Sequence, residues 1–122
     1  MSSEDPIVIV GMARTPMGGL LGELAGMSAN ELGAEAVKAA LAEAGVAGDD
    51  VDLIYMGNVL GAGQGQAPAR QAAIKGGLPK SVEATTLNKM CGSGMQAAII
   101  GRASIASGDA SVIVAGGMES MT

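Results

Sequence analysis

Short apolar runs alternate along this chain with segments of helical periodicity, and glycine or proline separates one segment from the next. Residues 7–10, 51–56 and 112–115 are largely apolar, and a glycine follows each run. Short apolar runs bounded in this way predict strands that are buried on both faces. Strands that alternate with helices predict an α/β fold, in which helices cover both faces of a largely parallel sheet.

The first helix is predicted to begin after Ser28. Glu31 stands three residues later and completes a capping box, in which each side chain accepts a hydrogen bond from a free backbone N–H at the start of the helix. Gly45 is placed to end this helix in the left-handed conformation. Between these ends, apolar residues recur at helical spacing: Leu32, Ala36, Val37, Ala40, Leu41 and Ala44.

The second half of the chain predicts two more helices and an extended segment. Pro68 suits the first position of a helix, which should stop at Gly76 or Gly77. Residues 82–90 are predicted to be extended because of their Val, Thr and Leu content. Residues 92–107 are predicted to form a helix with few polar side chains, so we expect this helix to be buried almost all round.

Composition excludes several classes of function. The 122 residues are enough for one domain, and a single Tyr with no Phe or Trp leaves aliphatic side chains to form its core. A net charge of −5 without a long basic run argues against a nucleic-acid partner. One cysteine and no histidine argue against a disulfide and a metal centre. Because the N-terminal segment lacks the features of a signal peptide and no apolar stretch approaches roughly 18 residues, we expect a cytoplasmic protein without a membrane partner.

The most reactive side chain is Cys91, which lies between the extended segment and the predicted buried helix in LNKMCGSGMQAA. The free N–H groups and partial positive charge of a helix N-terminus stabilise a thiolate. Gly92 and Gly94 place no side chain near the sulfur, so an acyl donor can approach and backbone N–H groups can face its carbonyl oxygen. Ser93 is expected to help cap the helix. A lone cysteine is also commonly a small buried hydrophobe, and its position alone leaves both interpretations open.

Other motifs indicate less. The segment GAGQGQ at residues 61–66 lacks the last glycine of a dinucleotide-binding motif, and no Gly-Lys pair is present to form a phosphate loop. By itself this segment predicts only a surface loop. Arg14 and Arg70 suit either a phosphate or a structural contact, and the sequence favours the structural role.

Four segments resemble the thiolases in order and spacing: ARTPMGGLLGEL from Ala13, GNVLGAGQGQAPARQAA from Gly57, LNKMCGSGMQAA from Leu87 and GGMESMT from Gly116. The match covers essentially the whole chain after the first few residues, and the cysteine and GQxPARQAA segments are its most specific parts. The resemblance implies a layered α/β fold like the N-terminal half of a thiolase. Its mostly parallel mixed sheet would be covered by helices, including a buried helix that follows the nucleophile.

The resemblance also implies an acyl-CoA C-acyltransferase with Cys91 as its catalytic nucleophile. The thiolate would take an acyl group from a 3-ketoacyl-CoA as acetyl-CoA leaves, or the acetylated cysteine would condense with a second acetyl-CoA. The backbone at Cys91 and Gly92 would support the oxyanion, and Asn88, Ser93 and Gly94 would support the nucleophile loop. Coenzyme A and acyl-CoA would be substrates rather than permanently bound cofactors.

The sequence departs from the thiolases in what it does not contain. Thiolases are longer and carry a histidine in a GHP motif, a second cysteine in a CxG motif and an asparagine in an NEAF-type motif. Residues 1–122 are therefore expected to form an incomplete N-terminal domain that needs the loop region and C-terminal domain for activity. The resemblance also implies a homo-oligomer, either a dimer or a tetramer.

Three other functions remain open at this point. The chain could be a non-catalytic assembly module of a split thiolase, because the resemblance places much of the dimer contact in this region. A ketoacyl-synthase-type condensing enzyme of the same fold also has a cysteine at a buried helix start, although the GQxPARQAA segment favours a thiolase. A cysteine redox sensor would leave the flanking motifs without a purpose.

Overall fold

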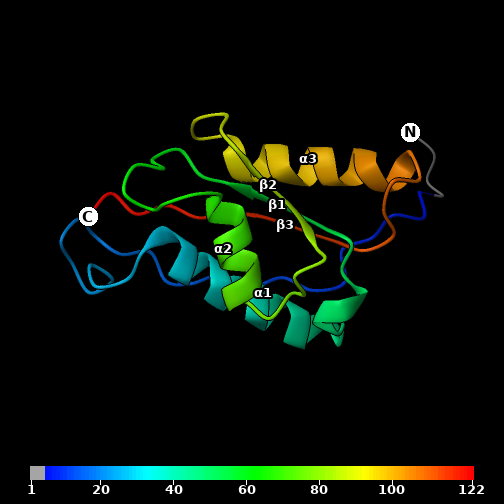
Figure 1. Ribbon diagram of the computed structural model, residues 1–122, viewed down its shortest axis with the longest axis horizontal. Helices are drawn as coiled ribbons and strands as arrows, with labels where there is room; N and C mark the ends of the chain where they lie inside the picture. The colour runs from blue at the N-terminus through cyan, green and yellow to red at the C-terminus, as the bar shows by residue number, and fades with distance from the viewer. Residues whose placement is uncertain (1–4) are drawn as a thin grey trace.

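A three-stranded parallel sheet lies between two layers of helices in the computed structural model, which describes residues 5–122 (Figure 1). Helices α1 and α2 cover one face of the sheet and α3 covers the other (Figure 1). The predicted α/β fold is confirmed. In chain order the elements are α1 (Ala29–Ala44), η1, a 3₁₀ turn (Gly48–Asp50), β1 (Leu53–Gly57), α2 (Pro68–Lys75), β2 (Glu83–Leu87), α3 (Ser93–Ala106) and β3 (Ile113–Gly117).

The central strand β1 pairs with both of its neighbours, so the strand order is β2-β1-β3. At the end of β1, Gly57 lies opposite Leu87 of β2 and Gly117 of β3. Because all three strands run in the same direction, their carboxyl ends meet at one edge of the sheet. The segment that carries Cys91 leaves the sheet at this edge, directly after β2.

The ends of α1 have the predicted caps. The Ser28 hydroxyl accepts a hydrogen bond from the Glu31 N–H at 3.3 Å, and the Glu31 carboxylate accepts one from the Ser28 N–H at 3.4 Å. Gly45 ends the helix with φ of 67°, in the left-handed region that favours glycine. Such an N-cap stabilises a helix by about 1 kcal/mol.

The remaining elements agree with the sequence to within a few residues. The predicted helix at Pro68 ends at Lys75, directly before Gly76, and β1 begins two residues later than the run that predicted it. The extended segment predicted to reach residue 90 ends as a strand at Leu87, because the chain then turns into α3. The core is aliphatic, as expected: Ile54 and Met56 are its largest fully buried side chains.

The strand predicted at residues 7–10 is wrong. In the structure these residues form no strand, and the side chains of residues 8–10 are 61% to 85% exposed. An ion pair of 2.6 Å between Asp5 and Arg102 anchors the chain just before this segment. The apolar run suggested burial, but hydropathy does not specify a partner strand. Within residues 5–122 no strand pairs with this segment.

The expectation that α3 is buried almost all round is also wrong. Its buried face carries small residues, Ser93, Ala97, Gly101 and Ser104, which pack against the sheet. On the outer face, Met95 is 74% exposed and Ile99 is 56% exposed. The sequence correctly predicts a helix without a polar face, but within residues 5–122 only the sheet covers α3, and it covers one side of the helix (Figure 1). Among the same residues, no helix has the length and apolar character needed to cross a bilayer.

Candidate functional site

Cys91 lies where the sequence placed it, at the opening turn of a helix and open to solvent. Its thiol is free and exposed, Gly92 is the N-cap of α3, and Ser93 is the first residue of the helix. The turn that carries Cys91 stands at the carboxyl edge of the sheet, between the end of β2 and the start of α3. The backbone N–H groups of a first helical turn point outward at this position and favour an anion.

The turn before Cys91 is strained and is held by two side chains. Met90 has φ of 50°, a left-handed conformation that costs a residue with a side chain roughly 1–2 kcal/mol. Asn88 accepts a hydrogen bond from the Met90 N–H at 2.9 Å through its side-chain oxygen. The Ser93 hydroxyl accepts from the Lys89 N–H at 2.8 Å and donates to the Met90 carbonyl at 2.6 Å. Asn88 and Ser93 therefore fix the backbone on both sides of Met90, next to the sulfur.

Ser93 differs from its expected role as a helix cap. The side chain is buried, with 5% of its surface exposed, and its hydrogen bonds reach back to the turn rather than to the free N–H groups of α3. A hydroxyl with both hydrogen-bond partners in place can be buried at little cost. Ser93 thus connects the cysteine turn to the buried face of the helix.

Three glycines allow the start of α3 to touch the backbone of the sheet, and we call Gly57, Gly94 and Gly117 the glycine cluster. A Cβ added at Gly57 would lie 2.5 Å from the Cβ of Ser93. A Cβ added at Gly117 would lie 3.3 Å from the Cα of Gly94. The first turn of α3 consequently lies directly on the ends of β1 and β3, with no room for a side chain at Gly57.

The two glycines that flank Ser93 have different roles. Gly92 is exposed, and a Cβ built on it would find only the Lys89 carbonyl oxygen nearby, at 3.5 Å, so the space beside Cys91 is open. The Gly92 N–H donates to that same carbonyl at 3.0 Å and closes the turn. A Cβ built on Gly94 would meet the backbone of Gly117 at ordinary contact distances of 3.8 Å and 3.9 Å. Gly92 therefore leaves space at the sulfur, whereas Gly94 packs on Gly117, where an added Cβ would come within 3.3 Å of the Gly94 Cα.

The GQxPARQAA segment holds the loop before α2 in place. Gln71 donates to the carbonyls of Gln64 and Gln66 at 2.6 Å and 2.8 Å, which folds the glycine-rich loop onto the helix. Arg70 donates to the Lys80 carbonyl at 3.2 Å, so it makes the structural contact that the sequence favoured. This segment therefore stabilises the loop before α2, in addition to resembling a thiolase motif.

Sequence reasoning missed Asn58, which follows β1 at the same edge of the sheet. Its side chain is buried, with 4% exposed, and it hydrogen-bonds to the Met118 carbonyl and to Glu119. An asparagine after a strand reads as an ordinary turn residue. The only available signal was its place directly after a glycine that ends a central strand.

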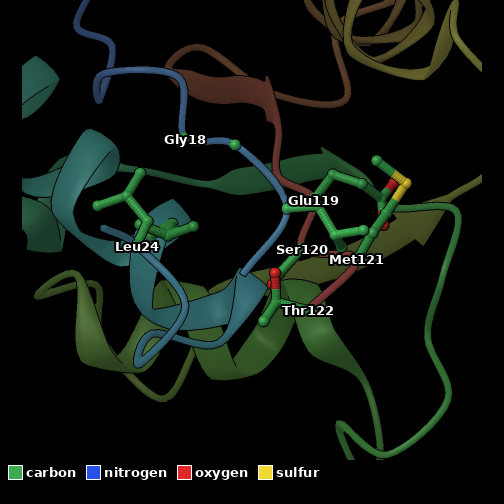
Figure 2. Close-up of a pocket in the computed structure, with 9 residues that line it drawn as sticks. Gly18, Leu24, Glu119, Ser120, Met121 and Thr122 are labelled. Carbon is green, nitrogen blue, oxygen red and sulfur yellow. The ribbon is translucent and has the colours of Figure 1, made fainter. Parts of the chain in front are cut away.

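A shallow hollow lies beside Glu119, between residues 18–24, helix α1 and residues 119–122 (Figure 2). Leu24 and Met121 contribute apolar surface to it, and Thr122 accepts a hydrogen bond from the Leu21 N–H at 3.1 Å. Cys91 is not among the residues that line this hollow. The hollow is therefore separate from the cysteine turn.

The fold and the site together define an α/β protein with an exposed cysteine at the carboxyl edge of a parallel sheet, directly before a helix. Residues 7–122 match the family model described as the N-terminal domain of thiolase. The chain belongs to the thiolase family. This match favours a thiolase over the ketoacyl-synthase alternative.

Several curated relatives are acetyl-CoA acetyltransferases by name. A cytosolic one from Gibberella zeae is 48% identical over 122 residues, which is 100% of this chain and 31% of the relative. A mitochondrial one from Xenopus tropicalis is 51% identical over 116 residues, 95% of this chain and 28% of the relative. One from Rhizobium meliloti is 52% identical over 120 residues, 98% of this chain and 30% of the relative. The chain thus spans about three tenths of the length of these relatives. The names of the first two give different compartments.

Proposed function

We propose that this chain carries the acyl-accepting cysteine of a thiolase. Cys91 would take an acyl group from an acyl-CoA, either in thiolytic cleavage of a 3-ketoacyl-CoA or in condensation of two acetyl-CoA molecules. The observation that supports this proposal most strongly is the exposed thiol directly before the N-cap of α3. The names of the relatives point to the same chemistry, because each is an acetyl-CoA acetyltransferase.

In the proposed first step, the Cys91 thiolate attacks the carbonyl carbon of the bound acyl group. With acetyl-CoA, a new C–S bond forms, the carbonyl oxygen becomes an oxyanion, and collapse of the intermediate expels the thiolate of coenzyme A. The backbone N–H of Cys91 is proposed as one donor to that oxyanion. Gly92 supports this geometry by leaving the approach to the sulfur open, and its own N–H holds the turn.

We propose that activation of the thiol before the first step, and the proton transfer of the second half-reaction, depend on groups that residues 1–122 do not contain. The chain has no histidine and only one cysteine, so it lacks the usual side chains for activating the thiol and moving a proton of the substrate. We therefore propose that residues 1–122 act as the N-terminal part of a thiolase, together with a C-terminal part that supplies these groups. Coenzyme A is proposed as a substrate rather than a resident cofactor, and a cytoplasmic homo-oligomer as the working form.

A thiolysis assay tests this proposal. We expect the native protein, together with its C-terminal part, to cleave a 3-ketoacyl-CoA in the presence of coenzyme A, and Cys91→Ser to abolish turnover without unfolding the protein. The 122-residue chain alone should give no turnover. Turnover by the chain alone, at a rate near that of full-length relatives, would contradict the need for outside groups. Turnover by Cys91→Ser would contradict the assignment of the nucleophile.

A non-catalytic assembly module is the second candidate, and the exposed apolar face of α3 favours it. Met95 and Ile99 present apolar surface that a partner polypeptide would cover. The two candidates differ in the behaviour of the thiol, because an assembly module does not require an acylated cysteine. An inert Cys91 in a protein that still associates with its partner would favour the assembly role.

A further inference from the structure

We propose that Asn58 is a positioning residue for Cys91. This inference rests on the proposed function of Cys91 as an acyl acceptor. Asn58 does not belong to the cysteine turn, but its hydrogen bonds join the ends of all three strands at the edge where that turn stands. It therefore acts on the sulfur through the backbone that supports it.

The backbone of Asn58 fixes the point at which the cysteine segment leaves the sheet. Its N–H donates to the carbonyl of Leu87 at 2.9 Å, one residue beyond the last paired position of β1 and β2. Leu87 is the last residue of β2, and Cys91 follows four positions later. Whatever moves the end of β2 consequently moves the start of the turn.

The side chain of Asn58 extends the pairing of β1 and β3 in the same way. Its amide donates to the Met118 carbonyl at 3.1 Å, while the Met118 N–H donates to the Gly57 carbonyl at 2.9 Å. These two bonds lie just past the last paired residues, Gly57 and Gly117. Both of these glycines belong to the glycine cluster, so Asn58 holds the two strands together directly beneath the first turn of α3.

The amide of Asn58 is itself held in one orientation. Gln64 donates to its oxygen at 2.7 Å, and its nitrogen also donates to Glu119 at 3.1 Å. The Glu119 carboxylate accepts two further bonds, from the N–H groups of Val59 at 2.8 Å and Leu60 at 3.0 Å. A buried polar network with every partner in place is rigid, and each lost partner leaves a costly unpaired group.

The close contact at the glycine cluster transmits any displacement to the sulfur. Because Gly57 lies against Ser93 with no space between them, spreading of the strand ends shifts Ser93 and the turn that its hydroxyl holds. A misplacement of about 1 Å between reacting groups can lower a rate by as much as ~100-fold. The predicted effect of losing the Asn58 amide is therefore on the rate of acyl transfer more than on substrate binding.

Asn30 offers a matched control. It is a buried asparagine with 3% of its surface exposed, and its side chain accepts a hydrogen bond from Lys75 at 2.6 Å. Its second contact, to Gln64, is long at 3.5 Å, and among residues 5–122 no hydrogen bond joins its side chain directly to the ends of the strands. Gln64 also donates to the Asn58 oxygen, so Asn30 reaches the Asn58 amide only through this one long contact. Asn30→Ala therefore removes a buried amide of the same kind and leaves the hydrogen bonds of Asn58 to Leu87 and Met118 in place.

The experiment compares Asn58→Ala and Asn30→Ala in the native protein. For each variant we measure three properties: thermal unfolding, kcat and KM for thiolysis, and the rate at which iodoacetamide alkylates Cys91. We expect both variants to lose thermal stability. Only Asn58→Ala should also lower kcat, by roughly tenfold to a hundredfold with little change in KM, and change the alkylation rate. A wild-type kcat in folded Asn58→Ala, or the same loss of kcat in Asn30→Ala, would overturn the proposal.

Glu119→Gln serves if Asn58→Ala does not fold. The Glu119 side chain is exposed, and this change weakens one partner of the Asn58 amide while leaving the bond of that amide to Met118 in place. We expect a smaller fall in kcat, again with little change in KM, and an unchanged kcat would refute the proposal. Cys91→Ser tests the proposed function separately, because turnover in that variant would contradict the role of Cys91 as the nucleophile. If the Asn58 and Glu119 variants keep the wild-type kcat, only the positioning role of Asn58 is contradicted.

Discussion

The two edges of the sheet are built differently. At the carboxyl edge, the glycine cluster brings helix and strands into backbone contact, and the buried Asn58 amide joins the strand ends. At the amino edge, Asp52 closes the pairing of β1 and β3 from the surface. Its carboxylate accepts hydrogen bonds from the N–H groups of Ser111 at 2.8 Å and Val112 at 3.1 Å.

This difference indicates which edge of the sheet tolerates substitution least. The carboxyl edge has no spare volume at Gly57, so an added side chain there must displace Ser93, whose hydroxyl holds the turn that carries Cys91. The amino edge faces solvent, and water can replace a lost hydrogen bond of Asp52 at modest cost. Substitutions at the two edges should therefore differ both in stability and in their effect on the thiol.

Gly57→Ala should have the largest effect. The new methyl group would lie 2.5 Å from the Ser93 Cβ. The Gly57 backbone cannot move away without breaking strand pairing, and moving Ser93 displaces the first turn of α3. We expect the free energy of unfolding to fall by about 3 kcal/mol, the upper part of the range for overpacked cores. Urea unfolding measures the loss.

Gly101→Ala is the control for that prediction, because it also adds a methyl group between α3 and the sheet. Its added Cβ would overlap the far end of the Ile113 side chain, which can rotate away, and the Ala115 Cβ would lie at an ordinary contact distance of 3.7 Å. The helix propensity of alanine offsets part of the cost, by about 1 kcal/mol. Equal losses at Gly57 and Gly101 would show that backbone contact at the carboxyl edge is not special.

Ser93→Ala should have an intermediate effect. It leaves the Lys89 N–H and the Met90 carbonyl without their hydroxyl partner beside a strained residue. We expect unfolding to become easier by about 2 kcal/mol and the alkylation rate of Cys91 to change. The matched control is Ser107→Ala, which removes an exposed hydroxyl bonded to the Ser104 carbonyl at the other end of α3. If both serine variants alkylate like the wild type, Ser93 does not hold the turn.

Asp52→Asn should have the smallest effect, and the effect should depend on pH. Hydrogen bonds from the N–H groups of Ser111 and Val112 lower the pKa of Asp52 below its usual 3.8. Its contribution to stability is therefore present above that usual value and lost as the pH falls through the lowered pKa. The difference in melting temperature between wild type and Asp52→Asn should shrink as the pH drops below 3.8. A difference that stays constant down to strong acid would exclude this role.

Much of the fold could be predicted because local sequence determines it. The capping box at Ser28, the first-position Pro68 and the helix after Cys91 all depend on neighbours close in the chain. The position of Cys91 followed from the same reasoning. Its exposure and its place before the N-cap of α3 agree with the prediction.

The features that could not be predicted depend on contacts distant in sequence. Residues 7–10 have the hydropathy of a buried strand, but a partner strand is not encoded in that run. The outer face of α3 is apolar, yet the sequence of the helix does not state what covers it. Asn58 has its role only because residue 118, sixty positions later, is brought beside it.

Mass spectrometry of the protein together with its C-terminal part, after incubation with acetyl-CoA, tests the central claim most directly. The proposed function predicts a single acetyl group, held as a thioester on the peptide that contains Cys91 and released by hydroxylamine. The same treatment of Cys91→Ser should leave that peptide unmodified. A folded protein in which Cys91 stays a free thiol, or in which the acetyl group is found on another residue, would contradict the claim that this edge of the sheet presents an acyl-accepting cysteine.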